Sequence, residues 1–343
     1  MEWGEAPKLL SGMEMLQQLD GVLTEYKKED LKKRRTELFD HDKHQYLNKN
    51  YDVEACADCP LLGKKVEELH HTSSESISED IIILVAGPNQ WKMRIYGPDP
   101  EVLNALRGTN TETLVDVPNE NIRFIANDAS TTANWVQNNI KNYSPAGLQN
   151  QIKVSTSIAA GLLSISYPPS QGSFSNEAKP FIKPIINLLV QNNAPLLVNA
   201  YPYLSYIGNR ANIGLDYALF TSPGIVVQDG SFGYQNIFDA IVDAHYSALE
   251  KEGGSNIRIV VSETGWPSEG NPGVATFEYA GTYSRNVVSL VKSGRGTPRR
   301  PGTGIETYLF AMFDENNKPG EETERHFGLF FPNQQCKYGI SFN

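Results

Sequence analysis

Cysteine and positive charge are both scarce in this chain of 343 residues. It contains three cysteines, Cys56, Cys59 and Cys336, and the long C-terminal part holds one of them, so no framework of disulfides supports that part. Lys and Arg number 30 against 40 Asp and Glu, which gives a formal net charge of -10. Because binding to phosphates needs concentrated Lys and Arg, we expect no nucleic-acid partner. A neutral ligand is easier to accommodate.

Long apolar runs are absent as well. The run from Ile81 to Ala86 is far shorter than the roughly 20 residues that a membrane-spanning helix needs. Residues 1–16 carry Glu2, Glu5 and Glu14 and lack the continuous apolar core of a signal peptide. We therefore expect no membrane partner and, by default, a cytoplasmic location.

Composition changes abruptly near residue 80. Before it the chain is dense in charge: Lys27 to Arg35 has the character of a solvated helix, and the serine-rich run from Ser73 to Asp80 resembles a linker. After it the composition is that of an ordinary globular chain. We predict a charged extension, helical or irregular, over residues 1–80 and a globular domain over residues 81–343.

Within the globular part, strand patterns alternate with helix patterns, which predicts an α/β fold with a parallel sheet. Strands are predicted at residues 93–96, 113–117, 152–158, 196–201, 257–262 and 306–313. Helices are predicted at residues 99–106, 130–142, 176–191, 234–252 and 276–292.

The strand at residues 257–262 leads directly into an acid, Glu263, and then into Gly265, Trp266 and Pro267. An apolar β-branched strand that ends in a carboxylate is typical of a parallel barrel, whose active face lies at the carboxyl ends of its strands. An apolar wall with Trp266 beside it would tune that acid. Hydrolysis of a sugar linkage needs a second carboxylate, so the partner of Glu263 becomes the main question.

Other predicted strands end in aromatic, amide and acidic residues: Tyr96, Asn199, Tyr201, Phe310 and Glu315. Aromatic rings stack on the C–H faces of sugars while amides and acids take the hydroxyl groups. The alternative for each ring is that it only fills the mouth of the barrel.

Five segments in the same order closely resemble plant endo-1,3-β-glucanases of glycoside hydrolase family 17, over residues 92–343. They are Met93-Arg-Ile-Tyr-Gly-Pro-Asp99, Val198-Asn-Ala-Tyr-Pro-Tyr203, Val261-Ser-Glu-Thr-Gly-Trp-Pro-Ser268, Phe313-Asp-Glu-Asn-Asn-Lys-Pro319 and Glu324-Arg-His-Phe-Gly-Leu-Phe-Phe-Pro332.

The resemblance implies a (β/α)8 barrel that cleaves internal 1,3-β-glucosidic bonds with retention, in carbohydrate metabolism and plant defence. It implies that Glu263 is the nucleophile and that β-1,3-glucan is the partner, with a monomeric protein and no cofactor. The substrate-binding residues expected on this basis are Tyr96, Asn199, Tyr201, Trp266, Phe310, Glu315 and Lys318. Relatives of this kind are secreted or vacuolar.

One departure concerns the general acid. Family members carry a strand ending in Gly-Asn-Glu between the helix that matches Trp135 to Asn142 and the segment that matches Ala146 to Ile152. This chain passes from one to the other through Tyr143-Ser-Pro145, so we expect that the fourth strand, its helix and the acid are deleted. Glu315 is the remaining candidate for the acid; the alternative is that it binds sugar hydroxyls or pairs with Lys318.

A second departure concerns the first barrel unit. Ile81 to Ala86 is a possible substitute for the first strand, but only Gly87 to Trp91 then separate it from Met93. That connection is too short for a helical crossover between parallel strands. We therefore predict an incomplete (β/α)8 barrel, with the first and fourth βα units altered or missing.

The extension contains four possible zinc ligands, His41, His44, Cys56 and Cys59. Two histidines and a Cys-x-x-Cys pair can bind zinc tetrahedrally, although their spacing fits no zinc finger. The alternative is a surface loop with reduced thiols, and elsewhere we expect no metal.

Three functions remain open. The first is a glucanase whose activity is impaired by the missing acid. The second is a protein that binds β-glucan without cutting it. The third is the product of a rearranged gene, because both departures fall at motif boundaries.

Overall fold

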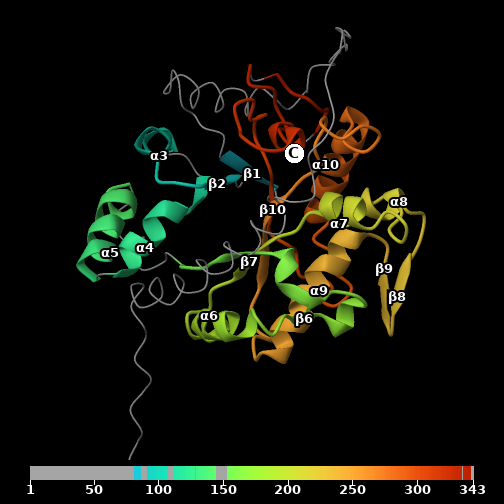
Figure 1. Ribbon diagram of the computed structural model, residues 1–343, viewed down its shortest axis with the longest axis horizontal. Coiled ribbons are helices and arrows are strands. Elements are labelled where there is room, and N and C mark those ends of the chain that lie inside the picture. The colour runs from blue at the N-terminus through green and yellow to red at the C-terminus, as the bar shows by residue number, and fades with distance from the viewer. Residues whose placement is uncertain are drawn as a thin grey trace, which may run out of the picture.

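The computed structural model describes residues 81–85, 91–106, 111–127, 129–143, 153–333 and 335–340. Its centre is a seven-stranded sheet with the order β3-β2-β1-β11-β10-β7-β4 (Figure 1). The strands are β1 (Ile81–Val85), β2 (Trp91–Ile95), β3 (Thr111–Val115), β4 (Ser157–Ala159), β7 (Leu196–Asn199), β10 (Ile259–Thr264) and β11 (Thr307–Leu309). Possible zinc ligands in the extension lie outside the described residues.

Six of these strands run in one direction and β1 runs against them. Strands β2 and β3, β4 and β7, β7 and β10, and β10 and β11 pair in parallel. Strand β1 lies between β2 and β11 and is antiparallel to both. Five residues, 86–90, join β1 to β2. An antiparallel pair needs no helical crossover, so the reversed strand is compatible with this short connection.

Helices make the longer connections between parallel strands. These are α3 (Pro100–Leu106) between β2 and β3, α6 (Lys179–Gln191) between β4 and β7, α9 (Ile237–Lys251) between β7 and β10, and α10 (Phe277–Lys292) between β10 and β11. The N-termini of α9 and α10 are capped by Asn236 and Thr276, whose side chains accept hydrogen bonds from the backbone three residues on.

Shorter elements complete the fold. They are the helices α4 (Asn119–Asn127), α5 (Ala129–Val136), α7 (Pro202–Gly208) and α8 (Leu215–Ala218), a π-helix at Gln137–Lys141, the 3-10 turns at Ala160–Leu162, Pro169–Gln171 and Glu322–Arg325, and two hairpins, β5 (Leu163–Ile165) with β6 (Ser173–Phe174) and β8 (Val227–Asp229) with β9 (Phe232–Tyr234). In Figure 1, α3, α4 and α5 lie to the left of the central strands, α9 and α10 lie to the right, and α6 lies below them.

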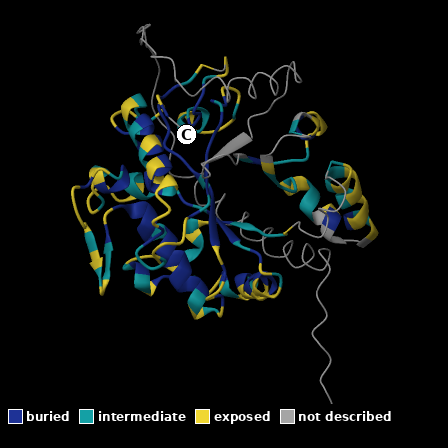
Figure 2. Ribbon diagram, turned by 180° about the vertical axis from the view of Figure 1, so that it is seen from behind, coloured by how far each residue is buried: buried dark blue, intermediate teal, exposed yellow. Residues whose placement is uncertain are grey.

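Strand β10 is buried on both faces, as the sequence predicts. Ile259 and Val261 pack into one hydrophobic cluster, with α6 and α9, whereas Val260 packs into another, with α10. Successive side chains of a strand point to opposite faces, so the strand is covered by protein on both sides. Helix α9 is buried over 12 of its 15 residues, and Figure 2 shows it in dark blue.

The predicted strands and helices are present, but their bounds differ. Strands β2 and β3 begin two residues earlier than predicted, and β10 begins two residues later. Two strands are much shorter: the one predicted at residues 306–313 is β11, Thr307–Leu309, and the one predicted at residues 152–158 is β4, Ser157–Ala159. Strands β3 and β4 stand at the two edges of the sheet. Residues 144–152, where the deletion is expected, lie outside the described residues. Among the described residues, no helix is long and apolar enough to cross a membrane, and no group of three or more His, Cys, Asp or Glu could hold a metal ion.

Candidate functional site

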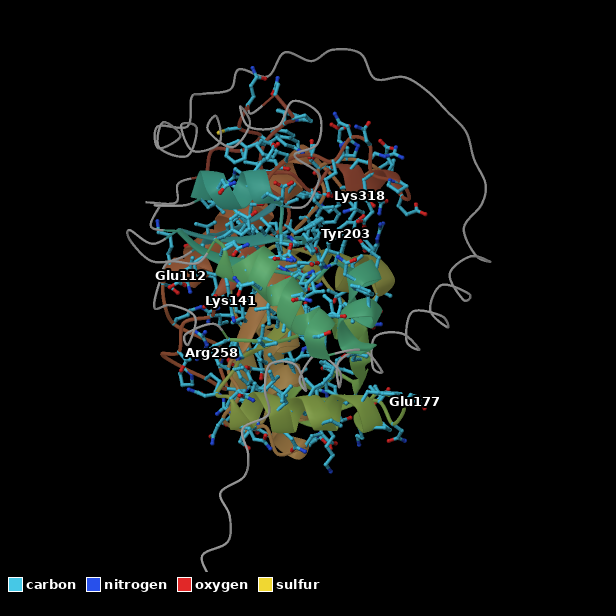
Figure 3. All side chains as sticks on the ribbon, turned by 90° about the vertical axis from the view of Figure 1, so that its left-hand side faces the viewer. Glu112, Lys141, Glu177, Tyr203, Arg258 and Lys318 are labelled. Carbon is cyan, nitrogen blue, oxygen red and sulfur yellow. The ribbon has the colours of Figure 1, made fainter. Side chains whose placement is uncertain are left out.

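The candidate site lies at the carboxyl ends of the parallel strands. Glu263 is the second-last residue of β10. Tyr96 and Phe310 directly follow β2 and β11, and Tyr201 lies two residues after the end of β7. The two ends of the sheet are easily told apart in Figure 3. Tyr203 and Lys318 lie on one side of the view, and Glu112 and Arg258, which belong to the amino ends of β3 and β10, lie on the other.

Three donors from two other strands hold the Glu263 carboxylate. Its Oε1 accepts hydrogen bonds from Arg94 Nη1 at 2.9 Å and from the hydroxyl of Tyr96. Its Oε2 accepts one from the hydroxyl of Tyr201 at 3.0 Å. The Glu263 side chain is 13% exposed, so it remains reachable. Hydrogen bonds to an ionised acceptor are stronger than neutral ones and fix its orientation.

Both phenols are donors that stay protonated. Burial raises the pKa of the Tyr96 hydroxyl, and the nearby Glu263 carboxylate raises it further. Burial and Glu263 likewise raise the pKa of Tyr201 well above its ordinary value. A protonated phenol donates to an ionised carboxylate, so the arrangement suits Glu263 as an anion.

Arg94 connects three strands around the carboxylate. Besides Glu263, its guanidinium donates to the Ser262 carbonyl at 3.0 Å and, through Nε and Nη2, to Asp116 Oδ2 at 3.1 and 2.6 Å. The Arg94 side chain is 4% exposed. Burial raises the pKa of Asp116, and the positive charge of Arg94 opposes that shift. One buried cation therefore neutralises two carboxylates, Asp116 and Glu263.

Asn199 is a neighbour of Glu263 in the sheet, although the structure gives no hydrogen bond between the two side chains. Asn199 is paired with Glu263 in the register of β7 and β10. Its Oδ1 accepts hydrogen bonds from the hydroxyls of Ser157 and Ser262, at 2.8 and 2.7 Å. These two hydrogen bonds orient the Asn199 amide, because both donors are hydroxyls that bind Oδ1 and the amide nitrogen then points away from them.

Aromatic rings join the Glu263 carboxylate to the strand that follows. Tyr201 makes edge contacts with Phe310 and Phe327, with ring centroids 6.4 and 5.9 Å apart. Phe310 and Phe327 are themselves 5.5 Å apart. Lys318 Nζ lies 4.6 Å above the centre of the Phe310 ring, a cation–π contact. Phe310 is 7% exposed, so most of its ring is already covered by protein.

Glu315 pairs with Lys318, which is one of the roles that the sequence leaves open for it. Lys318 Nζ lies 2.6 Å from Glu315 Oε2 and 3.6 Å from Glu324 Oε2. The Glu315 side chain is 2% exposed, whereas that of Lys318 is 26% exposed. Lys318 is thus the more accessible member of the pair.

Trp266 belongs to the core, in contrast to its expected role as a substrate-binding residue. It is 1% exposed and lies against Tyr203 and Tyr283, with ring centroids 5.2 and 5.7 Å away. Its indole N–H donates to the Val274 carbonyl at 2.9 Å. Such a ring has no face left for a sugar, so its contribution is to support the segment after β10 by packing.

Arg94 and Asp116 are the site residues that sequence reasoning missed. A visible signal existed: Arg94 is a charged residue between the buried Met93 and Ile95 of β2, and buried charges are normally paired. Asp116 follows β3, which pairs in parallel with β2. A charged residue in a buried strand and an acid at the end of its neighbour therefore indicate a buried ion pair.

The geometry alone describes a carboxylate held by three donors, beside aromatic rings and a lysine. A family model described as "Glycosyl hydrolases family 17" matches residues 71–146 and 143–342. The chain belongs to this family. The match covers all the residues that the structure describes. The two matched segments overlap at residues 143–146.

Plant relatives support the same assignment. The chain is 52% identical over 305 residues to a glucan endo-1,3-beta-glucosidase of Vitis vinifera, which covers 78% of this chain and 88% of the relative. It is 46% identical over 311 residues to the acidic isoform GI9 of glucan endo-1,3-beta-glucosidase from Nicotiana tabacum, covering 80% and 89%.

Solved structures agree with the sequence relatives. The β-1,3-glucanase and pollen allergen CJP38 of Cryptomeria japonica is 40% identical, with a TM-score of 0.71, and the match covers 74% of this chain and 90% of that one. A plant β-glucan endohydrolase is also 40% identical, with a TM-score of 0.67 and coverage of 73% and 90%. The fold is accordingly the α/β, (β/α)8 type of this family.

Proposed function

We propose that this protein acts on β-1,3-glucan and cleaves internal 1,3-β-glucosidic bonds with retention, with Glu263 as the nucleophile. Support comes from relatives that are 46–52% identical and are named glucan endo-1,3-beta-glucosidases. The single observation that carries the proposal is the Glu263 carboxylate, held by Arg94, Tyr96 and Tyr201 at the carboxyl ends of the strands.

In the first step a carboxylate oxygen of Glu263 attacks C1 of the sugar, the C1–O bond to the leaving group breaks, and the leaving oxygen takes up a proton from solvent. The product is a glycosyl ester of Glu263. In the second step water attacks C1 from the opposite side, loses a proton to solvent and releases the carboxylate, so that two inversions give retention. Arg94, Tyr96 and Tyr201 contribute by holding the carboxylate in place, because a correctly placed nucleophile removes much of the entropic barrier.

We further propose that hydrolysis of natural glucans is slow because the general acid is missing. The sequence has no Gly-Asn-Glu at a strand end, and the family match divides at residues 143–146, where that strand is expected. Strands β3 and β4, its expected neighbours, are at the edges of the sheet. Loss of general acid catalysis lowers the rate by about 10² to 10⁴-fold.

The proposed substrate contacts are with accessible polar groups around Glu263. Lys318 is held over Phe310 by a cation–π contact and between Glu315 and Glu324 by ion pairs, so its remaining donors can reach sugar hydroxyls. Asn199 pairs with Glu263 in the register of β7 and β10, and the hydroxyl of Tyr201 donates to Glu263 Oε2. We assign Glu315 to the orientation of Lys318, because their atoms are 2.6 Å apart.

Two measurements on the purified protein test this function. Isothermal titration with laminarihexaose measures binding, and the release of reducing sugar from laminarin is compared with the release of 4-nitrophenolate from 4-nitrophenyl β-laminaribioside. We expect binding, very slow laminarin hydrolysis and faster release of nitrophenolate. Binding with no turnover of either substrate would identify a glucan-binding protein instead, and a folded protein that binds neither substrate would contradict the proposal. Failure to obtain folded protein would favour a rearranged gene.

Replacing Tyr201 with Phe should lower kcat/KM for the nitrophenyl substrate by about tenfold. The change removes the one hydrogen bond that the structure gives to Glu263 Oε2, and a hydrogen bond to a charged group contributes about 1.5 to 3 kcal/mol. Tyr203→Phe is the matched control, because that hydroxyl accepts from Asn271 and makes no hydrogen bond to Glu263 in the structure. Equal losses in the two variants would argue against an orienting role for Tyr201.

A further inference from the structure

A buried lysine, Lys337, lies in the C-terminal segment, after the segments that carry the site residues. Its side chain is 1% exposed, and its ammonium lies 2.7 and 2.8 Å from the two carboxylate oxygens of Asp314. It also donates to Ser268 Oγ at 2.8 Å and approaches the His326 carbonyl at 3.4 Å. Burial lowers the pKa of Lys337, and Asp314 opposes that shift. A buried ammonium persists only when its partners are well placed.

These partners belong to the two segments that carry the site acids. Ser268 lies five residues after Glu263, in the connection that leaves β10. Asp314 directly precedes Glu315, in the connection that leaves β11. The Ser268 backbone N–H also donates to the His326 carbonyl at 2.9 Å, and the Gly328 N–H donates to Asp314 Oδ1 at 2.9 Å. Lys337 therefore joins the segment after β10 to the segment after β11, through Ser268 and Asp314.

The same segments touch through their backbones. A Cβ atom at Gly265 would lie 2.3 Å from the Phe310 carbonyl oxygen, and one at Gly328 would lie 2.2 Å from the Asp314 nitrogen. No side chain fits at either point, so each pair of backbone segments is in direct contact. A displacement of Asp314 is therefore passed on to the neighbouring segments rather than absorbed between them.

We propose that Lys337 is a positioning residue for the site: its ammonium locks the Asp314–Glu315 backbone against the segment that follows Glu263, and so sets the Glu315–Lys318 pair relative to the nucleophile. Lys337 makes no contact with substrate in this arrangement. The proposal rests on the proposed function for its catalytic readout, although the placement of Glu315 and Lys318 can be measured without it.

Substitution of Lys337 by Met tests the proposal, with Lys92→Met as the matched control. Lys92 is also a largely covered lysine with two carboxylate partners, Glu112 and Glu306 at 2.9 and 3.0 Å, but it lies at the amino ends of the strands. We expect both variants to be less thermostable. Only Lys337→Met should weaken laminarihexaose binding and kcat/KM by about tenfold or more, because small displacements in a site have large effects on rate.

Two further variants separate positioning from stability. Lys337→Met with Asp314→Asn leaves no unpaired charge, so it should recover thermostability without recovering binding, whereas Lys337→Arg should recover binding in part. A double variant that binds as well as the wild type, or equal effects of Lys337→Met and Lys92→Met, would show that the role is purely structural. If the wild type binds no glucan, the proposed function fails and binding cannot test the role of Lys337. The crystal structure of Lys337→Met then decides. A shift of Glu315 by about 1 Å supports the positioning role of Lys337, and an unmoved Glu315 overturns that role.

Discussion

Replacing Glu263 with Gln should abolish the release of 4-nitrophenolate from 4-nitrophenyl β-laminaribioside, with a fall in kcat of at least about 10⁴-fold. Nitrophenolate leaves without needing a proton, so the first step of this reaction depends on the nucleophile and needs no acid. The amide of Gln cannot attack C1. It keeps the size of the side chain and an oxygen for the donors Arg94 and Tyr96.

Glu315→Gln is the control for that experiment. Its carboxylate pairs with Lys318 and has no hydrogen bond to Glu263 in the structure. If Glu263 is the nucleophile, Glu315→Gln should weaken binding yet retain most of the nitrophenolate release. A Glu263→Gln variant that is folded, by its thermal unfolding transition, and still releases nitrophenolate would eliminate Glu263 as the nucleophile.

Azide distinguishes a missing acid from a replaced one. Without a second carboxylate no base activates water, so the glycosyl ester on Glu263 should accumulate. Azide needs no deprotonation, and its attack on C1 breaks the ester and regenerates the carboxylate. We expect azide to accelerate turnover of the nitrophenyl substrate and to give the β-glycosyl azide. Robust laminarin hydrolysis that is abolished by Glu315→Gln would instead identify Glu315 as the acid.

Local patterns in the sequence were sufficient for the strands that carry the site. The apolar run before Glu263 predicts a strand buried on both faces, and the structure places Val260 and Val261 in different clusters. Tyr96 and Tyr201 were predicted at strand ends because each follows an apolar run, and their hydroxyls meet at Glu263. In parallel strands the carboxyl ends coincide, so residues far apart in sequence could be assigned to one edge.

Local patterns could not predict the direction of β1, the burial of Trp266 or the partners of Arg94. The antiparallel direction of β1 depends on which strands close around it, and no local pattern in residues 81–85 distinguishes the two directions. Trp266 follows the acid in sequence, but the chain turns it into the core, where Tyr203 and Tyr283 cover it. The partners of Arg94, on β3 and β10, become neighbours only when the sheet forms. Long-range contacts of this kind have no signature within a single segment.

Replacing Arg94 with Met should lower the free energy of unfolding by about 3 to 5 kcal/mol at pH 7, as measured by urea denaturation. Removal of one partner of a buried ion pair has an effect of this size because it leaves an uncompensated charge. Here the guanidinium is 4% exposed and serves two carboxylates, which belong to different strands of the sheet. Met fills much of the same volume, so the packing loss is small compared with the loss of charge.

The size of this effect should depend on pH. Burial raises the pKa of Asp116 and Arg94 holds it down, so the variant's Asp116 has a higher pKa in the folded state. An acid whose pKa is raised by folding destabilises the folded state above that pKa and has no such effect below its unfolded value, about 3.9. The difference between wild type and Arg94→Met should therefore be largest at pH 7 and shrink as the pH falls toward 4.

A second substitution isolates the charge. Arg94→Met leaves two carboxylates, Asp116 and Glu263, without their cation. Adding Asp116→Asn removes one of these two charges and should recover part of the lost stability at pH 7, with little change at pH 4. The recovery cannot be complete, because Glu263 still lacks the donor that lies 2.9 Å from its Oε1. A deficit that is equal at both pH values, or that Asp116→Asn leaves unchanged, would mean that Arg94 acts through packing rather than through its charge.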